Sequence, residues 1–201
     1  MGQAEVLPSS SVTQLAPQAT SNLTGKGVRI AILDTGFGKS ETAFSQWSAF
    51  KSVTNQRNFT SANNEDYYDR YTLHEGLSYS YEGHGTPIAV IAGGSYGDFK
   101  GVAPEAEIMP IKVCDDDGKC LVSHVVQGVC YALNNAPVDD QGQRRLSNLV
   151  LNISLGGDRP NKSLYEVLKF ALENNVAVVT SAGNDGDGNP GTKDPIQYPA
   201  A

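Results

Sequence analysis

The sequence predicts an α/β fold of three layers, in which a mostly parallel sheet is flanked by helices. Short apolar runs rich in β-branched residues recur along the chain, and segments with the apolar period of amphipathic helices separate them. Strands and helices that alternate in this way form parallel sheets covered on both faces. The length of 201 residues, the 39% hydrophobic content and the 21 glycines suit one sizeable domain of this class.

The first predicted strand is the apolar run at 28–33, which ends in Asp34. Because apolar residues fill this run almost without alternation, we expect a parallel strand buried on both faces. Its carboxylate then lies at the carboxyl edge of the sheet, where ligands and catalytic groups gather in open α/β folds. The Gly-Lys-Ser at 38–40 is not a phosphate-binding loop, because that motif needs a glycine where Leu33 stands.

A polar, tyrosine-rich stretch at 51–81 follows, and it shows little periodicity. We predict a long surface insertion or short hairpins for it. His74, which lies within it, is expected to be solvated rather than catalytic.

A histidine between two glycines, at 83–85, precedes an apolar run that starts with Pro87. Proline has no N–H to donate and a fixed φ angle, so it fits the first turn of a helix. The residues that follow, 88–92, are too apolar for an exposed helix, and we expect this helix to be buried. His84 would then be held at its N-terminal end, with a glycine on each side for access, as a catalytic imidazole is. The alternative is a histidine that only caps the helix.

Three further strands and two further helices complete the predicted fold. A strand at 107–113 is followed by a helix at about 121–134 with valines along one face. An amphipathic helix at 163–174 separates the last two strands, which lie at 149–154 and 176–180. We predict that these three strands and the strand that precedes Asp34 are parallel neighbours in one sheet.

One domain accounts for residues 24–201, and residues 1–23 are predicted to be a loose N-terminal arm. The arm is rich in Ser, Gln, Thr and Pro and lacks the apolar segment of a signal peptide. No apolar stretch approaches the roughly 20 residues of a membrane span. The formal charge of −7, without a cluster of Lys and Arg, argues against nucleic acid and anionic membranes as partners.

Three cysteines are too few for a disulfide framework. Cys114 and Cys120 flank an acidic turn at 115–119, and the sequence leaves open whether they form a disulfide or are free thiols. If they are bridged, Cys130 is expected to be a free and buried thiol. The redox compartment stays open as well.

Three polar residues, Asp34, His84 and Asn184, stand at predicted strand or helix ends. A carboxylate that accepts a hydrogen bond from one imidazole nitrogen fixes the tautomer and leaves the other nitrogen free as a base. Asn184 follows the last strand in a turn, where its amide can donate to an oxyanion. Singly these are common turn or cap residues, but together they are three parts of an acyl-transfer site.

Six blocks of the chain resemble the subtilisin-like serine peptidases, in the family's order and from about Thr24 to the end. The blocks are 24–36 around the aspartate, 83–86 around the histidine, 101–104, 152–157, 181–184 and 198–200. The resemblance implies a subtilisin-like fold whose C-terminal part is missing from the chain. It also implies serine endopeptidase activity, in which Asp34 orients His84, His84 is the general base and Asn184 supplies the oxyanion-hole side chain.

The resemblance further implies two groups of substrate-binding residues. One group lines the primary specificity pocket: Ser154, Leu155 and Gly156, opposite Ala182 and Gly183. The other group pairs with an extended substrate as an added strand: Gly118, Lys119 and Cys120.

The nucleophile of the family is absent from the chain. In the family it stands in a Gly-Thr-Ser block several dozen residues beyond the asparagine motif, and no Gly-Thr-Ser occurs here. We therefore expect the serine downstream of Ala201, and we expect the 201-residue chain alone to be inactive. The alternative function is a serine-less pseudo-protease that binds peptides without cutting them.

This chemistry requires no cofactor, and no metal ligand is predicted, although the resemblance leaves a structural calcium ion open with weak support from the sequence. The family's calcium loop is replaced by a shorter segment at 93–98, and the acidic turn at 115–118 lacks the spacing of a calcium loop. The expected partner is a peptide or protein substrate, and the resemblance slightly favours a secreted or extracytoplasmic location.

Overall fold

A computed structural model describes residues 23–38, 50–63, 68–69, 83–96, 98–187 and 195–201. Its main sheet has the order β2-β6-β1-β7-β8, with β3 also paired to β6, and every pairing in it is parallel. The strands of this sheet are β1 (Arg29–Asp34), β2 (Ser52–Val53), β3 (Arg57–Asn58), β6 (Glu107–Lys112), β7 (Leu149–Ile153) and β8 (Ala177–Thr180). The helices are α2 (Gly85–Gly93), α3 (Val122–Asn134) and α4 (Lys162–Glu173), with a short 3₁₀ turn, η1 (Leu146–Asn148), before β7.

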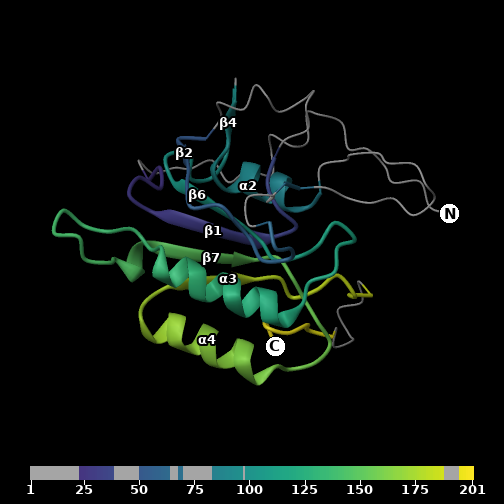
Figure 1. Ribbon diagram of the computed structural model, residues 1–201. Helices are drawn as coiled ribbons and strands as arrows, with labels where there is room; N and C mark the ends of the chain where they lie inside the picture. Colours follow the sequence, from purple (N-terminus) through teal and green to yellow (C-terminus); the bar gives the residue numbers. More distant parts are fainter. Residues whose placement is uncertain (1–22, 39–49, 64–67, 70–82, 97, 188–194) are drawn as a thin grey trace.

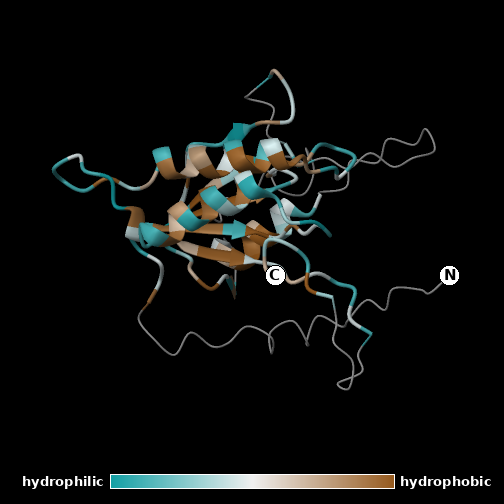
Figure 2. Ribbon diagram, turned by 90° about the horizontal axis from the view of Figure 1, so that it is seen from below, coloured by the Kyte–Doolittle hydropathy of each residue, from teal (hydrophilic) through white to brown (hydrophobic). Residues whose placement is uncertain are grey.

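The central strands β1 and β6 are largely buried on both faces, as the near-continuous apolar runs predict, whereas the edge strand β8 is exposed on one face. Figure 1 shows α3 and α4 on one side of the sheet and α2 on the other. In β1, Ala31 and Leu33 join the core beneath α3 and α4, whereas Ile32 packs with Ala89 of α2. Figure 2 shows strands that are mostly hydrophobic and helices that carry both hydrophilic and hydrophobic residues. The predicted three-layer α/β class is therefore confirmed, and the four main strands are parallel neighbours.

Two short strands lie where we predicted only a surface insertion or hairpins. β2 pairs with Glu107 and Ile108, and β3 pairs with Ile111 and Lys112, so both extend the main sheet beyond β6. The break between them coincides with Pro110 of β6, which has no N–H to donate. Strands of two residues carry no alternation that a sequence pattern can reveal. The rest of that stretch at 64–67 and 70–82, including His74, lies outside the described residues.

The helix that follows His84 is less buried than predicted. Its closest approach to the sheet is at small residues, Gly85, Ala89 and Gly93, while Ile88 packs beside them half-buried. A Cβ on Gly93 would lie 2.9 Å from Ile108 Cδ1. Ile91 faces away from this contact and is 58% exposed in the described part of the chain. The high apolar content of α2 therefore did not lead to full burial of the helix, because its small side chains face the sheet and some of its large ones face solvent.

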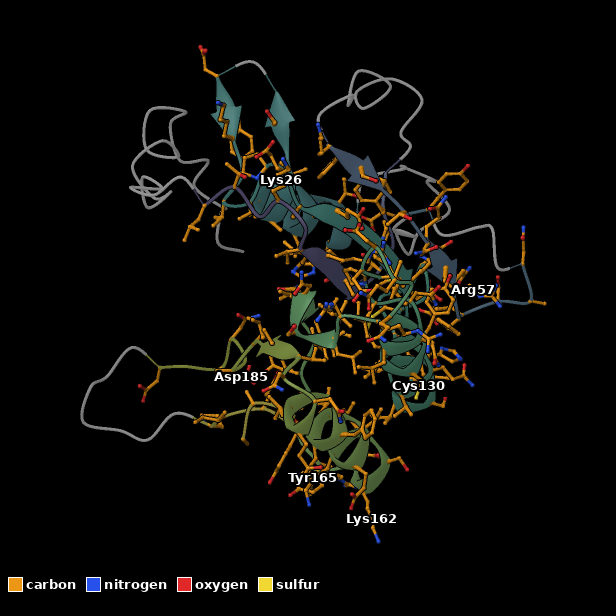
Figure 3. The ribbon with its side chains drawn as sticks, turned by 90° about the vertical axis from the view of Figure 1, so that its left-hand side faces the viewer. Lys26, Arg57, Cys130, Lys162, Tyr165 and Asp185 are labelled. Carbon is orange, nitrogen blue, oxygen red and sulfur yellow. A yellow bond between two sulfur atoms is a disulfide. The ribbon has the colours of Figure 1, made fainter. Side chains whose placement is uncertain are left out.

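Two other expectations need correction. The segment at 93–98, expected to be a shortened loop, begins an antiparallel hairpin of β4 (Ser95–Tyr96) and β5 (Phe99–Lys100). Cys130 is a free thiol but an exposed one, and Figure 3 shows it on the outer side of α3. No helix within the described ranges is long and apolar enough to cross a membrane.

Candidate active site

Asp34 is the last residue of the central strand, and its carboxyl group is buried. The backbone N–H groups of Val113 and Cys114 donate to its carbonyl oxygen, which fixes the end of β1 against the chain that leaves β6. The N–H of Thr35 donates to Asp34 Oδ1 over 2.7 Å. The carboxylate is thus held at the carboxyl edge of the sheet, where the sequence predicted it.

His84 stands directly before α2 and points its Nδ1 atom at this carboxylate. Nδ1 lies 3.0 Å from both Oδ1 and Oδ2 of Asp34, and the histidine side chain is 55% exposed. The imidazole makes no capping hydrogen bond to the helix, so the alternative of a histidine that only caps the helix does not describe it. A neutral imidazole that donates from Nδ1 to Asp34 keeps Nε2 free as a base.

The glycines beside His84 serve close packing rather than access. A Cβ on Gly85 would lie 2.3 Å from the carbonyl oxygen of Gly36 and 3.0 Å from Asp34 Cβ. A Cβ on Gly83 would lie 2.2 Å from Asp69 Oδ1. Only glycine at these positions lets the histidine segment lie directly against the end of β1.

The pKa of the Asp34 carboxyl is raised, and burial is the largest cause. The hydrogen bonds from Thr35 N–H and from His84, and the charge of His84, oppose this shift, while the nearby charge of Asp69 adds to it. The environment therefore disfavours the ionised carboxylate, and the histidine is one of the groups that stabilise it.

Two charged residues near the pair went unnoticed in the sequence. Asp69 is buried behind Thr35 and the start of α2. Lys112 ends β6 beside Asp34 in the sheet register, and its ammonium group donates to the carbonyls of Thr35 and Tyr68 and pairs with Asp116 at 2.8 Å. The sequence could have indicated Lys112, because a lysine at the end of an apolar strand is unusual and this strand ends in register with Asp34. Asp69 gave no such signal, since it stands in a polar stretch.

The segments expected to line a primary specificity pocket have a side chain between them. A Cβ on Gly156 would lie 2.0 Å from Gln197 Oε1, and a Cβ on Gly183 would lie 2.9 Å from Gln197 Cγ. Gln197 Nε2 donates to Asp185 Oδ2 over 2.9 Å, and its backbone N–H donates to the carbonyl of Ala182. Gln197, which the sequence did not single out, therefore occupies the space between these two loops. Ser154 and Leu155 are half-buried just beyond β7.

An apolar groove of about 520 Å³ lies beside these loops, between the start of α3 and the start of α4. Three of the predicted substrate-binding residues, Cys120, Leu155 and Gly156, line it, whereas Asp34 and His84 do not. Tyr165 and Lys162, which Figure 3 labels on α4, also line it. The other lining residues are Val122, Val125, Ile153, Gly157, Arg159, Pro160, Asn161, Leu164, Leu168, Tyr198, Pro199 and Ala201. The groove is suited to apolar side chains of a ligand and not to the chemical step itself.

A disulfide joins Cys114 to Cys120 and closes the acidic turn. Within the turn, Asp115 Oδ1 accepts hydrogen bonds from the N–H groups of Asp117 and Lys119. Gly118 and Lys119 are exposed at its tip. The question that the sequence left open is thus answered in favour of a bridge. Within the described residues, no group of three or more His, Cys, Asp or Glu side chains is arranged to hold a metal ion.

Asn184 follows β8 at the same edge of the sheet, and its side chain is exposed. No hydrogen bond among the described residues joins it to Asp34 or His84. Its contribution to an oxyanion hole stays a prediction.

Comparisons with a family model and with curated proteins agree, and each match covers most of this chain. A model described as the subtilase family matches residues 25–201. The major intracellular serine protease of Bacillus subtilis is 33% identical over 180 residues, which cover 88% of this chain and 49% of that protein. The minor extracellular protease Epr of the same organism is 29% identical over 183 residues, which cover 90% of this chain and 23% of that protein.

Solved structures agree with this match. Sphericase superposes with a TM-score of 0.67 at 26% identity, covering 90% of this chain and 53% of that chain. The S41 psychrophilic protease superposes with a TM-score of 0.62 at 28% identity, again covering 90% of this chain and 53% of that one. The chain spans about half the length of the first of the curated relatives that it matches.

Proposed function

This chain belongs to the subtilase family, and from that membership we propose that its protein is a serine endopeptidase that hydrolyses peptide bonds by an Asp-His-Ser mechanism. The observation that carries the proposal is the contact of His84 Nδ1 with both carboxylate oxygens of Asp34, at 3.0 Å each. An imidazole held in this way has the tautomer and the orientation that a general base needs.

In the proposed reaction, Nε2 of His84 removes the proton of a serine hydroxyl as the serine oxygen attacks the scissile carbonyl carbon. Asp34 stabilises the imidazolium that forms, and the amide of Asn184 donates to the oxyanion. The imidazolium then gives its proton to the leaving amine as the peptide bond breaks, which leaves an acyl-serine. Nε2 of His84 next removes a proton from a water molecule as the water oxygen attacks the acyl carbon, and the imidazolium returns that proton to the serine oxygen as the ester bond breaks. We expect the serine itself downstream of Ala201, as the family's order of residues implies.

The proposed substrate is an extended peptide segment of a protein. Its backbone would pair with the chain at 118–120, which the disulfide and the Asp115 turn hold in place. Apolar side chains of the substrate would enter the groove that Leu155 and Cys120 line. No cofactor is needed for this chemistry, because all proton transfers are made by side chains.

The domain assignment rests on the same comparison. The family match begins at residue 25, which supports a catalytic domain at 24–201 preceded by an arm at 1–23. Relatives named as intracellular and as extracellular both match the chain, so the family provides no preference for a secreted location.

The test is to express the 201-residue chain alone and also with its native downstream sequence. Both proteins are offered an unstructured protein substrate and a serine-directed phosphonylating probe. We expect turnover and labelling only in the extended protein, and loss of both when His84 is changed to Ala. Turnover by the short chain would show that the nucleophile lies within it. An inert extended protein without a Gly-Thr-Ser block would favour the peptide-binding pseudo-protease instead.

A further inference from the structure

A second buried carboxylate, that of Asp69, lies behind the proposed catalytic pair and takes no part in the proposed proton transfers. The residue is 7% exposed. Its Oδ1 atom accepts a hydrogen bond from Thr35 Oγ1 at 2.6 Å. Its Oδ2 atom accepts from the backbone N–H of Thr86 at 2.7 Å and from Thr86 Oγ1 at 2.5 Å. One carboxylate thus joins the residue after Asp34 to the residue two after His84.

The contact with Thr86 anchors the N-terminal end of α2. The first N–H groups of a helix have no partner within the helix, and a negative charge there is favourable. His84 makes no capping bond, so Asp69 satisfies this end of the helix from outside it. The imidazole of His84 is thereby left to Asp34. Thr86 Oγ1 also accepts from the N–H of Gly38, which ties the chain after β1 to the same point.

The contact with Thr35 decides where a hydroxyl proton points. Thr35 Oγ1 lies 2.6 Å from Asp69 but 3.3 Å from Asp34 Oδ1, and it accepts a hydrogen bond from Gly85 N–H at 3.0 Å. The hydroxyl has one proton, so donation to Asp69 withholds it from Asp34. Without Asp69, the nearest remaining acceptor is Asp34 Oδ1, which already accepts from Thr35 N–H and His84. A third donor on that oxygen would compete with the imidazole.

We propose that Asp69 is a positioning residue, which locks the start of α2 to the end of β1 and turns the Thr35 hydroxyl away from Asp34, so that His84 Nδ1 keeps the Asp34 carboxylate. The catalytic consequence rests on the proposed peptidase function, whereas the geometric consequence does not. The two can therefore be tested separately.

The geometric test uses the 201-residue chain labelled with ¹⁵N. The chain has three histidines, and the hydrogen-bonded Nδ1–H resonance of His84 is identified by its loss in a His84→Gln variant. We expect Asp69→Asn, whose amide nitrogen cannot accept a hydrogen bond, to shift this resonance upfield or broaden it beyond detection. The amide of Thr86 should at the same time exchange faster with solvent. The matched control is Asp139→Asn, because Asp139 also accepts two backbone N–H bonds but lies in the turn before η1. The control should leave both signals in place.

The catalytic test uses the protein extended beyond Ala201. A small displacement of the base from its productive position can cost about 10²-fold in rate, so we expect Asp69→Asn to lower kcat by about that factor with KM within about twofold. Thr35→Val removes the hydroxyl and so breaks the link from the end of β1 to Asp69, although it leaves no hydroxyl proton to compete for Asp34. It should therefore reproduce the part of both effects that comes from loss of this link, and Thr35→Ser should restore the parent values. The Thr35 pair also replaces Asp69→Asn if that variant does not fold.

An unchanged Nδ1–H resonance and an unchanged kcat in Asp69→Asn would overturn the proposal, as would Thr35→Val with both values of the parent. A shifted resonance in an extended protein that cleaves nothing would support the positioning role and reject the proposed peptidase function. An unshifted resonance in an extended protein that is an active peptidase would reject the positioning role alone.

Discussion

At the scale of single residues, the carboxyl group of Asp34 is buried where the proposed mechanism needs it ionised. Burial raises its pKa, while the Thr35 N–H and His84 lower it. Its folded pKa lies above its ordinary value, so the folded state holds this proton up to a higher pH than the unfolded state does. The contribution of Asp34 to stability is then fully present below the unfolded pKa of about 3.9 and is lost as pH rises through the raised folded pKa.

Replacing Asp34 by Asn should therefore change activity and stability in opposite directions. We expect kcat of the extended protein to fall by about 10⁴-fold, the size seen when the triad aspartate of a serine protease is changed to Asn and the histidine takes the wrong tautomer. We expect the free energy of unfolding of the variant to exceed that of the parent at neutral pH, with the difference disappearing as pH falls toward 4. Urea unfolding of both proteins between pH 3 and pH 8 measures this, and a parent that is more stable than the variant at pH 7 would contradict it.

Gly85 should tolerate no side chain. Its Cβ would meet the carbonyl oxygen of Gly36 at 2.3 Å and the backbone nitrogen of Gly36 at 3.2 Å, and a backbone segment has little room to yield. We expect Gly85→Ala to lower the free energy of unfolding by about 1–3 kcal/mol, as overpacked sites do, and to move His84 away from Asp34. Thermal unfolding measures the first effect. Gly157→Ala is the control for stability, because nothing lies within 4 Å of a Cβ there, and equal losses in both variants would reject the argument.

At the scale of elements, the loops that follow β7 and β8 meet across Gln197. Its side chain fills the space between Gly156 and Gly183, and Asp185 holds its carboxamide. Gly183 has a φ of +106°, so its backbone is itself suited to glycine. The size of the proposed primary pocket is thus set by a side chain from a third segment.

Replacing Gln197 by Gly should open this space. We expect the extended protein with Gln197→Gly to cleave peptides with a large apolar residue before the scissile bond at least about tenfold faster in kcat/KM, because a hydrophobic pocket discriminates by size to about that degree. Peptides with a small residue at that position should change by much less. Initial rates on a matched peptide pair test this, and an equal change for both peptides would place Gln197 outside the pocket.

At the scale of the whole molecule, β8 and α4 leave apolar side chains uncovered. Phe170, Leu172, Val179 and Ile196 are 51–58% exposed in the described structure. Val178 of β8 packs into the core beneath α3 and α4, whereas its neighbour Val179 lies on the opposite face of the strand. Exposed apolar surface of this kind promotes association.

We expect the 201-residue chain alone to self-associate, and the protein with its native downstream sequence to remain monodisperse. Sedimentation velocity at several concentrations measures both. Replacing Val179 and Leu172 by Thr and Gln should reduce association of the short chain if these residues cause it. A short chain that is monomeric at high concentration would show that this apolar surface does not drive self-association.

The sequence alone was sufficient to predict the four main strands, the helices between them and the positions of Asp34 and His84. These features depend on local periodicity and on the residue types at the ends of elements. Both can be recognised within a short stretch of the sequence. The pairing of Asp34 with His84 was predicted from the chemistry of a carboxylate beside an imidazole and from the family resemblance, and the two side chains lie 3.0 Å apart.

Only the tertiary structure revealed Asp69 behind Thr35 and Gln197 between Gly156 and Gly183. Asp69 contacts residues 34 positions before it and 17 positions after it, and such contacts leave no periodic trace in the chain. The same holds for the glycines beside His84, whose role depends on what packs against them. Local patterns determine which elements form, because each element depends on its own residues. The packing between segments that are distant in sequence decides what surrounds the candidate site.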